Sequence, residues 1–235
     1  MLTIQQIFDI IDDNCDSTST SYTTAKKVRD VNLAVDKFLG LAIQADGKWQ
    51  VDDSAHTKDP ILTTNLVASQ RDYHFTVDEQ SNYILDIFRV MIADENGRFY
   101  DLETADQQSK GYKSLGFVDG QNLTGKPTKY DKTGNGIFLD VIPSYSYTNG
   151  LKLFINREAY QFKTTDTALV PGFCPLFHEY FAIRPSYQFA YRKGLKNTAD
   201  LRLEMLLMED QITEYYSKRS KDEPTQIIPK WRSSR

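Results

Sequence analysis

The chain has 235 residues, of which 28 are basic and 32 are acidic, giving a net charge of −4, and 40% of the residues are hydrophobic. A chain of this length can bury a core of its own. Its apolar runs are too short to span a bilayer, and no basic region followed by a hydrophobic stretch suggests an export signal, so no membrane partner is expected. Cys15 and Cys174 are too few and too far apart for a disulfide framework, so both should be free thiols.

The first 46 residues have the spacing of two helices. Thr3 and Gln6 form a capping box, which predicts a helix that begins at about residue 4. After a loop rich in serine and threonine, apolar residues recur every three or four positions from Val28 to Ala42, and Asp46-Gly47 ends the pattern. We therefore expect two amphipathic helices within residues 1–46.

Residues 47–170 have the patterns of short strands. In residues 70–76, Tyr73 and Phe75 alternate with polar residues, as expected for a half-buried strand. Further strands are predicted at 84–93, 99–102, 127–131, 137–142 and 151–155, with turns at 94–97, 134–136 and 147–150. This region should form a small antiparallel sandwich or barrel that buries Tyr73, Phe75, Phe88 and Phe154, with a polar insertion of unassigned role at 106–126.

Residues 171–218 return to helical spacing. One helix is predicted over 175–195, with Gly194 as its C-cap and Pro185 as a kink or interruption. A last helix carries apolar residues every three or four positions from Leu201 to Tyr215 and should end near Lys218. The predicted fold is α+β, a single domain over residues 1–218 in which terminal helices flank the β-core.

These C-terminal helices have more apolar and aromatic side chains than one buried face can hold. The surplus residues are candidates for contacts between subunits: Tyr187, Tyr191, Leu203, Leu206 and Leu207. Closer packing of four helices within one subunit is the alternative.

The last residues, 219–235, differ in charge from the rest of the chain. Residues 218–235 hold six basic side chains against Asp222 and Glu223, so this end carries +4 and the remainder carries −8. Apolar residues are interspersed, which contact with bare phosphate does not require, so we expect an extended tail that docks on a protein, with a solvated end as the alternative. The tail residues with this role are Ile227, Ile228, Pro229, Lys230, Trp231, Arg232 and Arg235.

A series of residues spread along the chain resembles the head-to-tail adaptor proteins, or connector rings, of short-tailed bacteriophages. The residues that carry the resemblance after the helical N-terminus are Trp49, Asp52-Asp53, Pro60, Asn65-Leu66-Val67, Gln70, Tyr73, Pro127, Tyr130, the strand 137–142 ending in Pro143, the strand 151–155, and Pro175-Leu176-Phe177-His178. They cover nearly the whole chain in order, although no single motif among them is specific. The polar stretch 106–126 is longer than this family leads us to expect.

The resemblance implies a structural protein of the virion, assembled in the host cytoplasm. Twelve copies would form a ring beneath the portal protein, extend the channel for DNA and support downstream tail or neck proteins. The tail would reach the portal, and DNA would pass through the lumen without specific binding. The charge of −8 on the body is compatible with such passage and is equally typical of an ordinary soluble surface. The alternatives are a lower neck or stopper ring and a carbohydrate- or peptide-binding β-module of the virion.

Part of one enzymatic motif is present in the middle of the chain. Gly120, Gly125 and Lys126 have the spacing of a nucleotide phosphate loop, but Pro127 stands where serine or threonine should bind magnesium. Proline offers neither a hydroxyl nor an N–H group, and the following residues have strand character instead of helix.

A second motif is incomplete in the same way. His178-Glu179 begins like a helical zinc motif, but Ala182 occupies the position of the second histidine. We therefore predict no catalytic, cofactor-binding or metal-binding residue and no enzymatic activity.

Overall fold

The computed structural model describes residues 1–46, 55–105, 123–134 and 136–219, and the chain divides into two compact units. One holds residues 50–174 with Met1 and Thr3, and the other holds Leu2, residues 4–49 and residues 175–235. The first is built from strands and the second from helices, so we call them the β unit and the helical unit. That residues 1–218 form a single domain stays a prediction.

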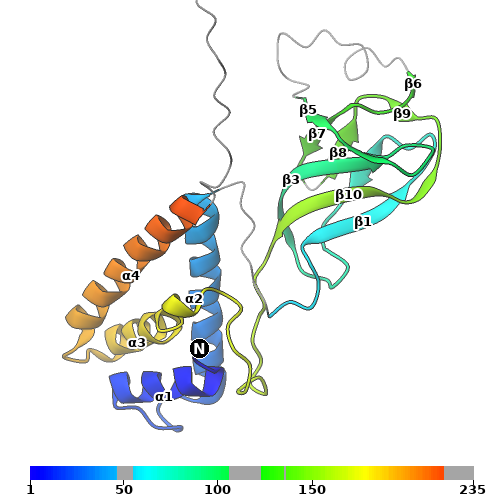
Figure 1. The fold of residues 1–235 in the computed structure, drawn as a ribbon. Coiled ribbons are helices and arrows are strands. Elements are labelled where there is room, and N and C mark those ends of the chain that lie inside the picture. The colour runs from blue at the N-terminus through cyan, green and yellow to red at the C-terminus, as the bar shows by residue number, and fades with distance from the viewer. Residues whose placement is uncertain (47–54, 106–122, 135, 220–235) are drawn as a thin grey trace, which may run out of the picture. The chain divides into compact units, whose positions relative to one another are not determined.

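The described part of the helical unit contains four α-helices and one short 3₁₀-helix (Figure 1). They are α1 (Ile4–Cys15), α2 (Thr24–Ala45), η1 (Pro175–Phe177), α3 (Tyr180–Lys193) and α4 (Thr198–Arg219). Helix α3 packs against the other three helices, and α2 also packs against α4. The helices predicted at both ends of the chain are thus confirmed, because their three-to-four-residue spacing places an apolar stripe on each helix.

Phe38 of α2 lies at the centre of the helical core and is completely buried. The centroid of its ring is 5.3 Å from that of Phe181 and 6.0 Å from that of Tyr180, both in α3. The ring of Tyr216 in α4 meets it edge-on at 5.8 Å. Aromatic pairs at such distances contribute about 0.5–1.5 kcal/mol each beyond the area they bury, so one side chain joins three helices.

Helix α3 continues through Pro185, so the predicted interruption does not occur. Proline cannot donate to the carbonyl four residues earlier, and next to it the hydroxyl of Ser186 donates to the carbonyl of Ala182 at 2.8 Å. The helix ends at Gly194, whose φ of +67° is left-handed and whose N–H group bonds to carbonyls of the last turn. Gly194 is therefore the C-cap that the sequence predicts.

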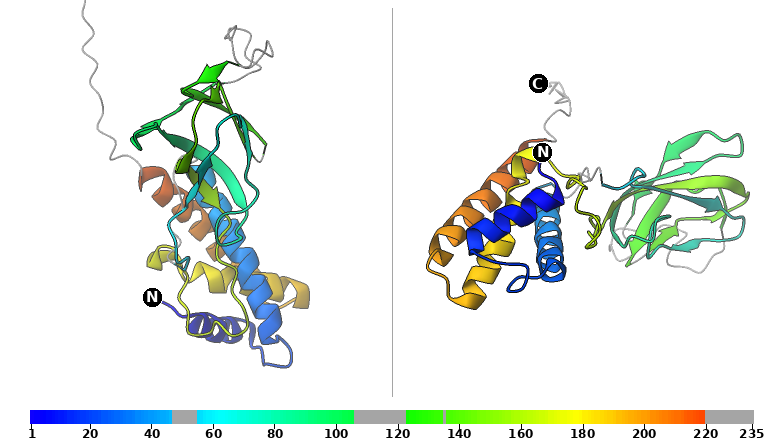
Figure 2. Two further views of the ribbon diagram at one scale, coloured as in Figure 1. Left: turned by 90° about the vertical axis from the view of Figure 1, so that its right-hand side faces the viewer. Right: turned by 90° about the horizontal axis from the view of Figure 1, so that it is seen from below.

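The described part of the β unit forms two four-stranded sheets and one two-stranded pair (Figure 2). The strands are β1 (Ile61–Leu66), β2 (Asp72–His74), β3 (Ile84–Ala93), β4 (Phe99–Asp101), β5 (Glu103–Thr104), β6 (Thr124–Gly125), β7 (Lys129–Thr133), β8 (Gly136–Leu139), β9 (Ile142–Pro143) and β10 (Tyr147–Arg157). The sheet orders are β1-β10-β3-β4 and β2-β8-β7-β5, and β6 pairs with β9. All strand pairs are antiparallel except β5 with β7 and β6 with β9.

Both four-stranded sheets contribute to one hydrophobic cluster, in which Ile92, Ile137 and Leu153 are completely buried. Each sheet is open, with two edge strands, so the described strands form no closed barrel. The α+β class with helices at both ends is confirmed. The prediction that four aromatic residues are buried holds for Tyr73 and Phe75, whereas Phe88 and Phe154 are only half-buried.

The turn predicted at residues 147–150 is wrong, because these residues lie within β10. The register between β1 and β10 shifts between Thr64 and Leu66, and Asn149 has a left-handed φ of +55°. The backbone N–H of Asn149 donates to Oδ1 of Asn65 at 2.8 Å. A β-bulge uses the same Asn-Gly chemistry as a tight turn, which explains the error.

Gly97 in the turn between β3 and β4 tests how strongly the β unit depends on a glycine. Its φ is +79°, and an added Cβ would lie 2.3 Å from the hydroxyl oxygen of Tyr147. Gly97→Ala should therefore lower the free energy of unfolding by about 2–4 kcal/mol, from the left-handed conformation and the overlap together. Urea denaturation of the wild type and of the variant measures this loss.

Gly134 provides the matched control, since its φ is +57° but an added Cβ would meet nothing within 4 Å. Gly134→Ala should cost only about 1–2 kcal/mol, the penalty of the left-handed conformation. Equal losses in the two variants would show that the contact with Tyr147 contributes nothing.

Candidate interaction surface

An apolar groove of about 630 Å³ lies between α3 and α4 on the helical unit. It is lined by Tyr187, Tyr191, Lys196, Thr198, Ala199, Arg202, Leu203 and Leu206. Five of these eight residues are aromatic or aliphatic, and two, Lys196 and Arg202, are cationic. An exposed surface of this composition is typical of a protein contact.

The groove exists because α4 carries apolar residues on two opposite faces. One face packs into the unit and consists of Leu201, Met205, Ile212 and Tyr216, all buried. Leu203 is 62% exposed and lies about 160° around the helix axis from Leu201 and from Met205. Leu206 and Leu207 are also about half exposed. A surface helix needs only one apolar stripe for its own fold, so packing within the unit does not account for the second face.

A polar contact joins α3 to α4 beside the groove. Oε1 of Glu209 accepts hydrogen bonds from the hydroxyl of Tyr180 and from the guanidinium of Arg184, each at 2.8 Å. Burial, and secondarily the carboxylate of Glu209, raise the pKa of the Tyr180 hydroxyl, which remains a donor. Glu209 is thus partnered within the chain.

Four of the five predicted subunit-contact residues meet in this groove. They are Tyr187 and Tyr191 on α3 and Leu203 and Leu206 on α4. Leu207 is exposed but does not line the groove. The surplus apolar residues could be identified from the sequence, but the other lining residues, from Lys196 to Arg202, could not. Their only signal in the sequence is that they lie between the apolar residues of α3 and those of α4.

The predicted tail cannot be placed in the same way. Its docking residues, from Ile227 to Arg235, lie outside the described residues, as does most of the insertion predicted at 106–126.

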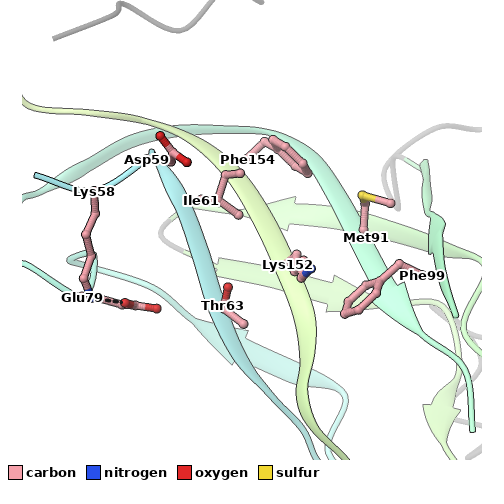
Figure 3. A pocket seen from close by; sticks show the side chains of 9 residues that line it. All are labelled: Lys58, Asp59, Ile61, Thr63, Glu79, Met91, Phe99, Lys152 and Phe154. Carbon is pink, nitrogen blue, oxygen red and sulfur yellow. Dashed lines mark hydrogen bonds and ion pairs between the residues drawn. The ribbon is translucent and has the colours of Figure 1, made fainter. Parts of the chain in front are cut away.

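A second hollow, of about 430 Å³, lies on the face of the β1-β10-β3-β4 sheet opposite the core (Figure 3). It is lined by Lys58, Asp59, Ile61, Thr63, Glu79, Met91, Phe99, Lys152 and Phe154. The Nζ of Lys152 lies 4.0 Å from the centre of the Phe99 ring, and the guanidinium of Arg89 lies 4.8 Å from that of Phe154. Because cations of the same chain already cover both rings, the rings are poor stacking platforms for a sugar or a peptide side chain.

The histidines make contacts within the fold. His178 is buried, and its Nδ1 accepts a hydrogen bond from the backbone N–H of Leu2 at 3.1 Å. Nε2 of His56 lies 3.1 Å from the carbonyl of Glu158, and His74 pairs with Asp72 at 3.1 Å. No group of three histidine, cysteine or acidic residues within the described ranges could hold a metal ion.

Cys15 and Cys174 are free, as predicted. None of the helices that the structure describes is long and apolar enough to cross a membrane.

Comparison with known proteins adds no relative: no protein-family model matches the chain, and no curated protein is significantly similar to it.

Proposed function

We propose that this chain is a structural virion protein that forms a ring beneath the portal of a tailed bacteriophage, connects head to tail and extends the DNA channel. The observation that carries the proposal is the second apolar face of α4, which forms the groove with Tyr187 and Tyr191 and which the helical unit leaves exposed. Copies of one chain related by rotation contact each other through two different surfaces, so each copy needs a pair of unlike patches.

We take Leu176 and Tyr215, two further exposed apolar side chains of the helical unit, as the partner patch for the groove. Leu176 of η1 is 74% exposed. The ring centroid of its neighbour Phe177 lies 5.4 Å from that of Tyr215. Tyr215 is 37% exposed and lies twelve residues along α4 from Leu203, about 18 Å away. The groove of one copy would receive the Leu176–Tyr215 patch of the next, which gives the head-to-tail contact that a closed ring requires.

The other parts of the proposal rest on the resemblance. Twelve copies would match the portal, residues 219–235 would dock on it, DNA would pass through the lumen without specific binding, and later tail proteins would bind below. The same surfaces also suit a lower neck or stopper ring, which remains the closest alternative. A carbohydrate- or peptide-binding β-module is less well supported, since cations cover Phe99 and Phe154 on the hollowed sheet face.

Electron microscopy of portal particles mixed with the full-length chain tests the lateral contact. Wild-type protein should add a complete ring, whereas Leu203→Glu combined with Leu206→Glu should leave portals with incomplete rings or none, because two charges would replace apolar contact surface and lose their hydration when the neighbouring copy binds. The control is Leu33→Glu with Leu85→Glu, which makes the same charge change at two half-exposed leucines outside the groove. If the control fails equally, or the groove variant still forms complete rings, the groove is not the subunit contact.

A chain that ends at Lys218 tests the tail in the same assay. It should fail to add a ring to the portal while its helical unit stays folded. If neither the full-length nor the shortened chain attaches, the lower neck ring or an unrelated binding module is the better interpretation.

A further inference from the structure

A small basic hollow of about 290 Å³ lies on the helical unit, between the beginning of α2 and the end of α3. It is lined by Ser21, Tyr22, Lys26, Arg29, Phe189, Arg192 and Lys193. Four of these seven side chains are cationic, and none is acidic. Such a concentration of positive charge contrasts with the net charge of −4 of the whole chain.

A buried carboxylate holds the two arginines in place. The Asp30 side chain is 1% exposed, and its Oδ1 accepts hydrogen bonds from Nε and an NH2 group of Arg29, at 3.0 and 2.9 Å. Its Oδ2 accepts from the hydroxyl of Tyr22 at 2.7 Å and from the guanidinium of Arg192. These bonds use only part of the five N–H groups that each guanidinium carries. Both arginines are therefore fixed before any ligand arrives, which lowers the entropic cost of binding.

The charges do not cancel. Burial alone would raise the pKa of Asp30, but the hydrogen bonds from Tyr22, Arg192 and Arg29 outweigh it and lower that pKa, so the carboxylate is ionised at neutral pH. Asp30 offsets one of the two guanidinium charges, and Lys26 and Lys193 are both exposed. The hollow therefore keeps a net charge of about +3.

We propose that this hollow binds a phosphate group, supplied either by a nucleic-acid backbone or by a small phosphate compound. Planar guanidinium forks and flexible ammonium groups together suit an anion whose several oxygens point in different directions. Arg29 and Arg192 retain side-chain exposures of 58% and 46%, so the remaining donors are accessible to a ligand. This inference does not depend on ring formation.

The test measures binding of two phosphate probes to the full chain, a short labelled DNA duplex by fluorescence anisotropy and inorganic phosphate by calorimetry. A labelled polyglutamate peptide is the comparison that carries no phosphate. Lys26→Ala combined with Lys193→Ala removes half of the cations and leaves both arginines on Asp30. This variant should bind at least about tenfold more weakly at low salt, and the slope of log affinity against log salt for the duplex should fall by about 1.8. Lys37→Ala with Lys163→Ala is the control, since both lysines are exposed and lie outside the hollow.

The pattern of loss identifies the source of the phosphate. Loss of both probes would support a site that accepts the backbone of a nucleic acid, and loss of inorganic phosphate alone would support a small phosphate compound. The proposal is overturned if neither probe is weakened, if the control loses as much, or if only binding of a polyglutamate peptide depends on the two lysines, which would indicate an acidic protein partner. A thermal melt of each variant confirms that the loss is not one of folding.

Discussion

Replacement of Phe38 by alanine should lower the free energy of unfolding of the helical unit by about 3–5 kcal/mol. The side chain is completely buried and touches rings from α3 and α4, so its removal leaves a cavity that three helices would have to collapse into. Thermal denaturation followed by near-ultraviolet circular dichroism would report the loss, because the surrounding tyrosines give the signal.

Leu33→Ala on the same helix is the control. Leu33 is 48% exposed, so its truncation should cost well under about 1 kcal/mol. Similar losses for Leu33→Ala and Phe38→Ala would contradict the central place of Phe38 in the core.

Arg157→Ala in the β unit should cost about 3–5 kcal/mol, because it leaves a buried carboxylate without its cation. The guanidinium of Arg157 contacts Oδ2 of Asp78 at 3.0 Å, and the two side chains are 7% and 6% exposed. The control is Arg89→Ala, which breaks the half-exposed pair of Arg89 with Asp101 and should cost at most about 1 kcal/mol. Equal losses in urea denaturation would show that burial does not strengthen the Arg157 pair.

The same pair gives the β unit a dependence on pH. Burial alone would raise the pKa of Asp78, but hydrogen bonds from Asn82 and Arg157 lower it below its ordinary value of 3.8. A lowered pKa stabilises the folded state above that ordinary value, and this contribution is lost as the pH falls through the folded pKa. Arg157→Ala removes one of the lowering contacts and brings the folded pKa of Asp78 closer to its ordinary value, so the variant should lose less stability on acidification than the wild type and the difference between the two proteins should shrink as the pH falls.

These substitutions also test the prediction of a single domain, since Phe38 belongs to the helical unit and Arg157 to the β unit. If residues 1–218 unfold as one domain, each substitution should lower the midpoint of a single transition. Two transitions, of which each substitution moves only one, would show that the units fold separately.

The helices could be predicted from the sequence because their spacing and their caps agree. The three-to-four-residue pattern of α2 and the C-cap Gly194 both survive in the structure. Strand β3 was predicted with its bounds because it is almost continuously apolar and ends in a strong turn. Strand β1 was missed, since Thr63, Thr64 and Asn65 interrupt any alternation. Strand β1 forms because it pairs with β10, although its own sequence has no strand pattern.

The apolar groove and the basic hollow differ in how far they could be predicted from the sequence. The apolar groove could be anticipated because Leu203 and Leu206 fall off the buried stripe of one helix. The basic hollow could not, because Asp30 and Arg192 are 162 residues apart in the chain and only the packing of α2 with α3 brings them together. Asp30 by itself reads as a solvated residue of an amphipathic helix, whereas in the structure it is fully buried.

Helix α4 is one uninterrupted rod from Thr198 to Arg219, and residues 220–235 continue from its far end. The groove lies near one end of this rod, about 24 Å along the axis from where those residues begin. If they dock on a portal, each copy is held at a fixed radius and tilt. The orientation of α4 would then set the angle at which the grooves of adjacent copies face one another. A one-residue insertion in α4 between Leu207 and Ile212 would turn Ile212 and Tyr216 by about 100° relative to Leu201 and Met205, so the two halves of the buried stripe could no longer pack into the unit together.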